Sequence, residues 1–237
     1  MPNEYFKFKQ FTIHQSGCAM KVGTDGVLLG AWAAVSDGKA LDMGCGSGLI
    51  ALMLAQRSKA EVLGIDIEAG AAIQARENVA KSPWKDRVAI EKISIQDFVA
   101  LAKPKQFDTI VCNPPFFENS KEAPEYERTL ARHAVRLNWK DLIHALEYLL
   151  TVDGVFSLII PFDQARSFTE QAVKSGLFAS RICHVVPRPG KNPKRCLLEF
   201  QKKEVPLVED ELFVELDKRH QYSERYKKLT KDFYLAF

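Results

Sequence analysis

Asn113-Pro114-Pro115-Phe116 places an amide, two prolines and an aromatic ring directly after an apolar run, 107–112. The run is typical of a buried strand, which the prolines end because they lack the backbone N–H that a sheet requires. Taken alone, the four residues could be a turn that has no binding role. An amide oxygen and a proline carbonyl oxygen can also accept both hydrogens of one amino group, while Phe116 or Phe117 stacks on a flat ring. The spacing therefore favours a site for an exocyclic amine on a planar base.

A second pattern, Asp42-Met43-Gly44-Cys45-Gly46-Ser47-Gly48, stands between a short expected strand and an apolar, alanine-rich expected helix. Glycine-rich turns of this kind let backbone N–H groups approach a ligand closely. Asp66 ends the next expected strand, 18 residues after Gly48. Acids near this spacing accept ribose hydroxyls in nucleotide-binding folds. The glycines could serve only a tight turn and Asp66 could merely cap a helix, but the order of the three patterns predicts a nucleotide-like cofactor beside a base.

The order of these patterns resembles the class I S-adenosylmethionine-dependent methyltransferases. The glycine pattern is similar to their cofactor loop, and Asn113-Pro114-Pro115-Phe116 is similar to the catalytic motif of the branch that methylates amino groups. Three further stretches, Phe8–Phe11, Ala19–Trp32 and Lys231–Leu235, are similar to the bacterial tRNA(Val) adenine-37 N6-methyltransferase family. The resemblance runs from about Phe8 to the last residues and covers nearly the whole chain.

This resemblance implies a methyl transfer from S-adenosylmethionine to N6 of an adenine in tRNA, adenine 37 of valine tRNA. Lys21 to Asp25 would close over the methionine end of the cofactor, and Asp97 would bond its adenine amine. Arg132 and His133 follow the catalytic motif, and His133 is interpreted as a structural residue rather than a base. The implied catalytic residues are Asn113, Pro114, Pro115 and Phe116. The implied cofactor-binding residues are Lys21, Thr24, Asp25, Asp42, Gly44, Cys45, Gly46, Gly48, Asp66, Ile67, Gln96, Asp97 and Asn113.

Basic residues gather in one part of a chain whose net charge is only +3. Residues 181–203 contain seven Lys/Arg and one acid, Glu199. A locally basic segment on a near-neutral body predicts a phosphate-binding surface, and a solvated strand–loop–strand with ordinary lysines is the alternative. Arg195 could instead pair with Glu199 or Asp153. The residues expected to contact RNA are Phe116, Phe117, Arg188, Lys191, Lys194 and Arg195.

Alternating apolar segments and helical patterns predict an α/β fold with a doubly wound, mainly parallel sheet. We expect a seven-stranded Rossmann-like methyltransferase sheet whose last strand is antiparallel, because no helix separates the final two strands. A hairpin or strand should occupy 4–16. The expected strands are 39–43, 61–67, 88–95, 107–112, 154–160, 179–186 and 195–202. The expected helices are one capped by Thr24 or Asp25 and ending near Ala34, then 47–57, 69–81, 96–101, 138–150 and 163–175, with a charged loop at 117–128.

Length and composition are those of one globular domain over 1–237, with a short N-terminal extension at about 1–36. No apolar run approaches the ~18 residues of a membrane span, and Met1–Glu4 lacks the basic start and apolar core of a signal peptide. The five cysteines are scattered without a C-x-x-C pair, so we expect a reducing cytoplasm and neither disulfides nor a metal site. We expect a monomer.

Other activities share parts of this pattern. Protein-glutamine methyltransferases use a similar motif, usually with tyrosine last, and carry an extra N-terminal helical domain for which the 41 residues before Asp42 leave too little room. A DNA adenine methyltransferase would need a separate target-recognition domain, and an rRNA adenine remains a possible target. A non-catalytic module that senses the cofactor and binds RNA is a further alternative, against which the intact Asn113-Pro114-Pro115-Phe116 argues.

Overall fold

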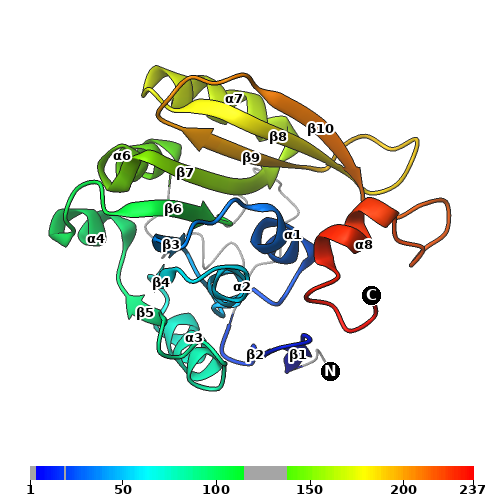
Figure 1. Ribbon diagram of the computed structural model, residues 1–237, viewed down its shortest axis with the longest axis horizontal. Coiled ribbons are helices and arrows are strands. Elements are labelled where there is room, and N and C mark those ends of the chain that lie inside the picture. Colours follow the sequence, from blue (N-terminus) through cyan, green and yellow to red (C-terminus); the bar gives the residue numbers. More distant parts are fainter. Residues whose placement is uncertain (1–3, 19, 115–137) are drawn as a thin grey trace, which may run out of the picture.

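An eight-stranded sheet with helices on both faces forms the body of the protein (Figure 1). The computed structural model describes residues 4–18, 20–114 and 138–237. Its strands are β1 (Tyr5–Lys7), β2 (Thr12–His14), β3 (Lys39–Met43), β4 (Glu61–Asp66), β5 (Val88–Lys92), β6 (Phe107–Cys112), β7 (Leu150–Pro161), β8 (Phe178–Val186), β9 (Arg195–Gln201) and β10 (Val208–Phe213). Its helices are α1 (Thr24–Trp32), α2 (Leu49–Arg57), α3 (Ala69–Ala80), α4 (Ile95–Leu101), α6 (Trp139–Leu149), α7 (Phe162–Lys174) and α8 (Glu224–Thr230).

The strand order is β10-β8-β9-β7-β6-β3-β4-β5, and β9 runs antiparallel to both of its neighbours. The expected mainly parallel sheet is therefore confirmed, as is its antiparallel seventh strand. An eighth strand, β10, pairs in parallel with β8 and was not expected, nor was helix α8. The sequence of β10, Val208-Glu209-Asp210-Glu211-Leu212-Phe213, is too acidic to indicate a strand. The strand forms because pairing with β8, rather than local propensity, stabilises it.

The winding of the sheet reverses at β3, whose neighbours are β4 on one side and β6 on the other. In open α/β sheets such a point leaves a crevice at the carboxyl ends of the strands, where ligands bind. Met43 at the end of β3 lies opposite Cys112 at the end of β6. The register therefore brings the glycine-rich loop after Met43 beside Asn113.

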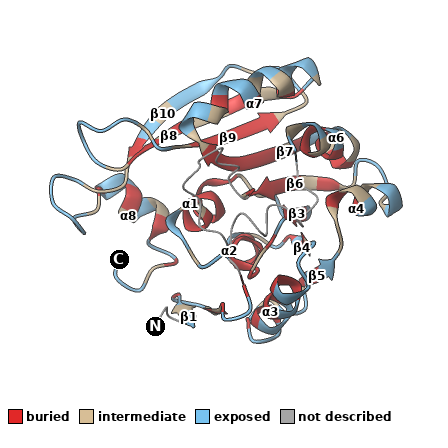
Figure 2. Cartoon of the chain, turned by 180° about the vertical axis from the view of Figure 1, so that it is seen from behind, coloured by how far each residue is buried: buried red, intermediate tan, exposed pale blue. Residues whose placement is uncertain are grey.

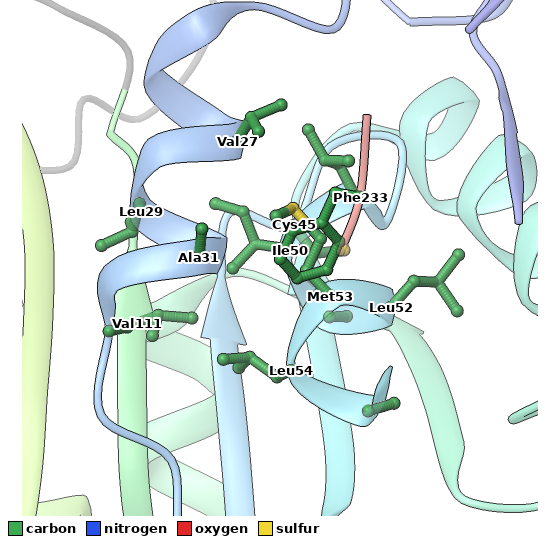
Figure 3. Close-up of a cluster of buried hydrophobic side chains, with 14 of the residues drawn as sticks. Val27, Leu29, Ala31, Cys45, Ile50, Leu52, Met53, Leu54, Val111 and Phe233 are labelled. Carbon is green, nitrogen blue, oxygen red and sulfur yellow. The ribbon is translucent and has the colours of Figure 1, made fainter. Parts of the chain in front are cut away.

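Two apolar cores lie on the two faces of the sheet, and buried positions follow the strands through the molecule (Figure 2). Side chains alternate between the cores, because successive strand residues point to opposite faces. Val111 belongs to the core formed with α1, α2, α3 and α8, whereas Ile110 and Cys112 belong to the core formed with α4, α6 and α7. In Figure 3, side chains of α1 and α2 pack together with Phe233 from the C-terminal tail.

Several element boundaries differ from the expected ones. Helix α1 begins after Gly23, which is extended and gives no side-chain cap, so the expected cap by Thr24 or Asp25 is wrong. The same helix ends at Trp32 rather than near Ala34. Strand β5 ends at Lys92 because the Ser94 hydroxyl accepts the Asp97 N–H and starts α4. Strand β7 begins at Leu150, directly after α6. The expected charged loop, 117–128, lies outside the described residues.

The N-terminal hairpin packs against the C-terminal tail. The Lys9 backbone N–H donates to the Phe233 carbonyl at 2.9 Å, and the Lys9 ammonium donates to the Lys231 carbonyl at 2.6 Å. Aromatic rings fill the space between the two segments; Phe6, Phe8 and Tyr234 have ring centroids 4.8–6.0 Å apart. Among the described helices none is long and apolar enough to cross a membrane.

We expect Phe233→Ala to lower the free energy of unfolding by about 3–5 kcal/mol, the usual cost of removing a buried aromatic side chain. Phe233 is 2% exposed and Leu235, two residues later, is 59% exposed. Leu235→Ala is therefore the matched control and should change stability by less than about 1 kcal/mol. Urea unfolding of both variants measures the difference. Equal losses in the two would show that the tail does not contribute to the core.

Candidate active site

The loop after β3 has the backbone that a close ligand approach requires. Gly44, Gly46 and Gly48 all have positive φ, at 72°, 53° and 80°, a region that strains any residue with a side chain. A Cβ atom at Gly44 or Gly46 would meet no other atom within 4 Å, whereas one at Gly48 would lie 3.3 Å from the Cβ of Ala75 on α3. Gly48 therefore permits the close packing of α2 on α3, and the first two glycines face open space that a ligand can occupy.

The Asp66 carboxylate fastens this loop. Its Oδ2 accepts the Gly46 N–H at 2.8 Å, and its Oδ1 accepts the Glu68 N–H at 2.9 Å. Burial raises the pKa of Asp66, and these two backbone donors oppose the rise. Each carboxylate oxygen can accept a second hydrogen bond, so the side chain retains capacity for two ligand hydroxyls.

Asp42 is completely buried at the end of β3. Its Oδ2 accepts the Ala51 N–H at 3.0 Å, whereas its Oδ1 has no hydrogen-bond partner among the described residues. Burial raises the pKa of Asp42 to about 7, and the negative charge of Asp66 adds to the rise. A buried acceptor without a donor is costly, and a donor from a ligand would satisfy it.

Asn113 presents a second acceptor of this kind. Its buried Oδ1 has no partner among the described residues, and Pro114 after it is buried. Helix α1 closes over the amide, since a Cβ atom at Gly26 would lie 3.8 Å from the Asn113 Nδ2. The other expected members of this motif, Pro115, Phe116 and Phe117, lie outside the described residues, as do Arg132 and His133.

Three amide side chains that were not expected, those of Gln15, Gln74 and Asn78, hold the N-terminal residues 14–22 at the site. The Gln15 Oε1 accepts the Val22 N–H at 2.7 Å, and Gln15 also accepts the Lys21 ammonium through its backbone carbonyl. Burial raises the pKa of the Cys18 thiol, and a Cβ atom at the neighbouring Gly17 would lie 3.5 Å from the Gly70 carbonyl, so this segment lies against α3, the helix that follows β4.

On α3, the other two amides receive this segment and the hairpin. Gln74 Oε1 accepts the Gly17 N–H at 3.3 Å. Asn78, 1% exposed, donates to the carbonyls of both His14 and Ser47 and accepts the His14 N–H. Asn78 thereby joins β2 to the glycine-rich loop. The spacing of Gln74 and Asn78 on one helical face was the available sequence signal.

Asp25 and Arg195, expected to bind cofactor and RNA respectively, form an ion pair with each other at 2.8 Å. The suggested partners of Arg195 are engaged elsewhere, since Glu199 pairs with Arg181 and Asp153 pairs with Lys203. The Asp25–Arg195 pair lines an open cavity of about 380 Å³ together with Thr24, Lys194, Glu215 and apolar residues. The start of α1 and the start of β9 therefore meet at one place.

The residues after β4 and β5 also lie at the carboxyl ends of the parallel strands, as Asn113 does. Ile67 is 40% exposed directly after Asp66. Asp97 is exposed, and its carboxylate accepts the Ser94 hydroxyl at 2.7 Å in a helix cap. Gln96 donates to Asp141 on α6 at 2.8 Å, so part of its amide serves to join α4 to α6.

The basic loop, Arg188–Lys194, also lies at this edge. Arg195 at the start of β9 pairs with Pro161 at the end of β7 and with Val185 near the end of β8. The antiparallel course of β9 thereby carries the loop to the carboxyl ends of the parallel strands, where Asn113 lies. Arg188, Lys191 and Lys194 are exposed and form no ion pair with another described residue.

The described residues hold no group of three or more His, Cys, Asp or Glu side chains arranged to bind a metal. All five cysteines are free and buried. Across the described part of the site, the buried side-chain atoms that lack partners are oxygen acceptors, Asp42 Oδ1 and Asn113 Oδ1. Its open space borders glycine backbone. These unpartnered hydrogen-bond acceptors fit a ligand that carries N–H and O–H groups.

Comparisons with known proteins agree with this geometry. Residues 19–140 match the family model of the methyltransferase small domain. The chain is 47% identical to a tRNA1(Val) (adenine(37)-N6)-methyltransferase of Bacteroides thetaiotaomicron, with 99% of each chain covered. It is 49% identical to the protein so named in Phocaeicola vulgatus, again over 99% of each. Among solved structures, a predicted O-methyltransferase from Agrobacterium tumefaciens shares the fold at a TM-score of 0.66 and 19% identity, covering 88% of this chain and 96% of that one.

We expect the buried Asp42 to make stability depend on pH. Its pKa is about 7 in the folded protein and ~4 in an unfolded chain, so between these values the folded state binds more protons. The free energy of unfolding should therefore fall as pH rises from about 4 to 7, by on the order of a few kcal/mol from this residue. Asp42→Asn should flatten that fall, whereas Asp86→Asn, at an exposed position, should leave it unchanged. Urea unfolding at several pH values measures both, and identical pH profiles for wild type and Asp42→Asn would refute the assignment.

Proposed function

The chain belongs to the tRNA1(Val) (adenine(37)-N6)-methyltransferase family, and on that premise we propose that it transfers a methyl group from S-adenosylmethionine to N6 of adenine 37 in valine tRNA. The single observation that carries the chemistry is the buried Asn113 Oδ1, which lacks a partner among the described residues. It lies beside the glycine-rich loop because β3 and β6 are neighbours. An acceptor in that position fits a target amine.

We propose that the cofactor lies across the ends of β3 and β4. Backbone at Gly44 and Gly46 leaves room for it, and Asp66 accepts its ribose hydroxyls. Ile67 packs on its adenine ring, and Asp97 accepts the adenine amine while keeping its bond to Ser94. The methionine end is held by Lys21, Thr24, Asp25 and Asp42, and the remaining positions in contact are Cys45, Gly48, Gln96 and Asn113.

The chemistry assigned to the protein is orientation of a weak nucleophile. The adenine amine is conjugated with its ring, so its lone pair is poorly available. Asn113 Oδ1 and the Pro114 carbonyl would accept its two hydrogens and turn the lone pair toward the cofactor side of the site. Bound S-adenosylmethionine supplies an electrophilic methyl group. Holding the two reactants in this geometry can lower the barrier by ~7–11 kcal/mol, and the amine loses its proton after transfer.

The RNA contacts in this proposal are of two kinds. The exposed cations Arg188, Lys191 and Lys194 neutralise phosphates at the same edge of the sheet as Asn113. Turning the adenine out of its stack costs a few kcal/mol, and stacking on Phe116 or Phe117 would return roughly 1–3 kcal/mol of that. Arg195 contributes through the loop it anchors, because its guanidinium is paired with Asp25.

We further propose that one chain is the working unit, a single domain in which the N-terminal extension is part of the site. The support is that one chain carries the glycine-rich loop, Asn113 and the basic loop on one edge. Because the proposed substrate is tRNA, we place the reaction in the cytoplasm.

Two substitutions should separate binding from chemistry. We expect Asn113→Ala to reduce turnover on valine tRNA by roughly 100-fold or more, because an amine that is no longer oriented reacts slowly. Its affinity for S-adenosylmethionine should stay near that of wild type. Asp66→Ala should mainly weaken the affinity for S-adenosylmethionine, by about 1.5–3 kcal/mol, through loss of bonds to a charged acceptor.

Calorimetry measures cofactor affinity, and transfer of a labelled methyl group to tRNA, followed by nucleoside mass spectrometry, measures turnover and product. A tRNA carrying guanosine at position 37 is the substrate control. Turnover of Asn113→Ala within a few-fold of wild type would remove Asn113 from the chemistry. Failure of the wild-type enzyme to form N6-methyladenine in valine tRNA would refute the proposed function itself.

The basic loop makes a separate prediction about salt. We expect the double substitution Lys191→Ala and Lys194→Ala to weaken tRNA binding and to reduce the slope of log affinity against log salt by roughly one unit per lost phosphate contact. Lys81→Ala with Lys85→Ala is the matched control, because both lysines are exposed near the opposite edge of the sheet, between α3 and β5. Filter-binding titrations at several salt concentrations measure the slopes. Equal slopes for the two double variants would place the tRNA on another face.

A further inference from the structure

Phe162 is the one exposed phenylalanine among the described residues, with 42% of its surface accessible. It is the first residue of α7 and directly follows Pro161, the last residue of β7. Helix α7 buries its apolar face through Ala165, Phe168 and Ala172, so Phe162 is not needed to attach the helix to the sheet. A single exposed hydrophobic residue does not by itself mark a binding site, so the case for Phe162 depends on what surrounds its ring.

The Phe162 ring is supported from one side. It meets the ring of His184 edge-on, with centroids 5.4 Å apart and planes at 66°. His184 is itself fixed at both nitrogens, since Nε2 lies 2.5 Å from Glu209 Oε1 and Nδ1 lies 3.3 Å from Cys196 Sγ. The phenyl ring is therefore held in place before any partner arrives, which lowers the entropic cost of binding on its open side.

The position of Phe162 connects it to the basic loop and to the proposed target site. Its backbone N–H donates to the Lys194 carbonyl at 3.2 Å. Pro161 before it pairs with Arg195, and β7 lies next to β6, with Leu158 opposite Cys112. Strand spacing and rise place Phe162 on the order of 10 Å from Asn113 along the same edge of the sheet. That separation is short enough for neighbouring nucleotides of one strand to reach both.

An exposed ring next to a loop with unpaired cations is a combination that binds single-stranded nucleic acid, in which charges hold phosphates and rings stack on bases. A protein partner would require a wider apolar patch than one ring beside the loop that carries Arg188, Lys191 and Lys194. We propose that Phe162 stacks on an unpaired base next to the target adenine and so positions the RNA loop. This inference rests on the proposed function and adds to it a positioning residue outside the catalytic motif.

The test compares Phe162→Ala with Phe162→Tyr and with Val173→Ala in the full-length protein. Val173 lies on the same helix, is 44% exposed and is far along α7 from the site. Loss of a base–aromatic stack should weaken binding of a valine tRNA anticodon stem–loop roughly 5- to 150-fold in Phe162→Ala, with Phe162→Tyr and Val173→Ala near wild type. The salt slope should not change, since no charge is removed, and cofactor affinity should stay constant.

Stem–loops with a single abasic residue on either side of adenine 37 provide the decisive arm. If Phe162 stacks on one of those bases, removing that base should weaken wild-type binding and should cancel most of the difference between wild type and Phe162→Ala. Equal binding by Phe162→Ala and wild type, or an undiminished difference on both abasic RNAs, would overturn the inference. Either result leaves the proposed function standing whenever the wild-type enzyme still methylates adenine 37, so the two failures are distinguishable.

Discussion

A single carboxylate organises the turn on which this site depends. Asp66 accepts the N–H of Gly46 with one oxygen and the N–H of Glu68 with the other, so one side chain fixes both the loop after β3 and the start of α3. Backbone bonds also shape this loop, since the Gly44 and Cys45 N–H groups donate to the Ile65 carbonyl and the Gly48 N–H donates to the Cys45 carbonyl. Since the same carboxylate is assigned to the ribose, loop order and cofactor binding are coupled. A weaker cofactor affinity after its removal measures both contributions together.

The N-terminal hairpin and the C-terminal tail pack on each other and on the helices that cover the sheet. Asn78 joins the N-terminal hairpin to the glycine-rich loop, and the Lys9 backbone joins that hairpin to Phe233 of the tail. The similarity to the family at Phe8–Phe11 and around Phe233 therefore has a packing explanation. These segments stabilise the segment that carries Lys21 at the mouth of the site, and they do so without any requirement to contact RNA.

Local sequence was sufficient to predict those features that end or begin an apolar strand. Asp66 and Asn113 could be placed because each follows a run that can only be buried, and the glycine-rich loop because its pattern needs a turn. The Asp25–Arg195 ion pair could not be predicted, because its members are 170 residues apart and no local pattern relates them. Asn78 was missed for a similar reason, since an amide on a helix is ordinarily a solvent-exposed residue and only the hairpin buries it.

Strand β10 has a consequence for how copies of this protein meet. It forms the last strand of the sheet beyond β8, so no further described strand pairs with its outer side, although the Glu211 carbonyl accepts the Arg225 guanidinium. Glu209, Asp210 and Glu211 occupy half of its six positions, and only Leu212 is buried. Extension of the sheet by the same strand of a second molecule would bring like charges together. The acidity that hides β10 in the sequence thus protects the sheet against edge-to-edge aggregation.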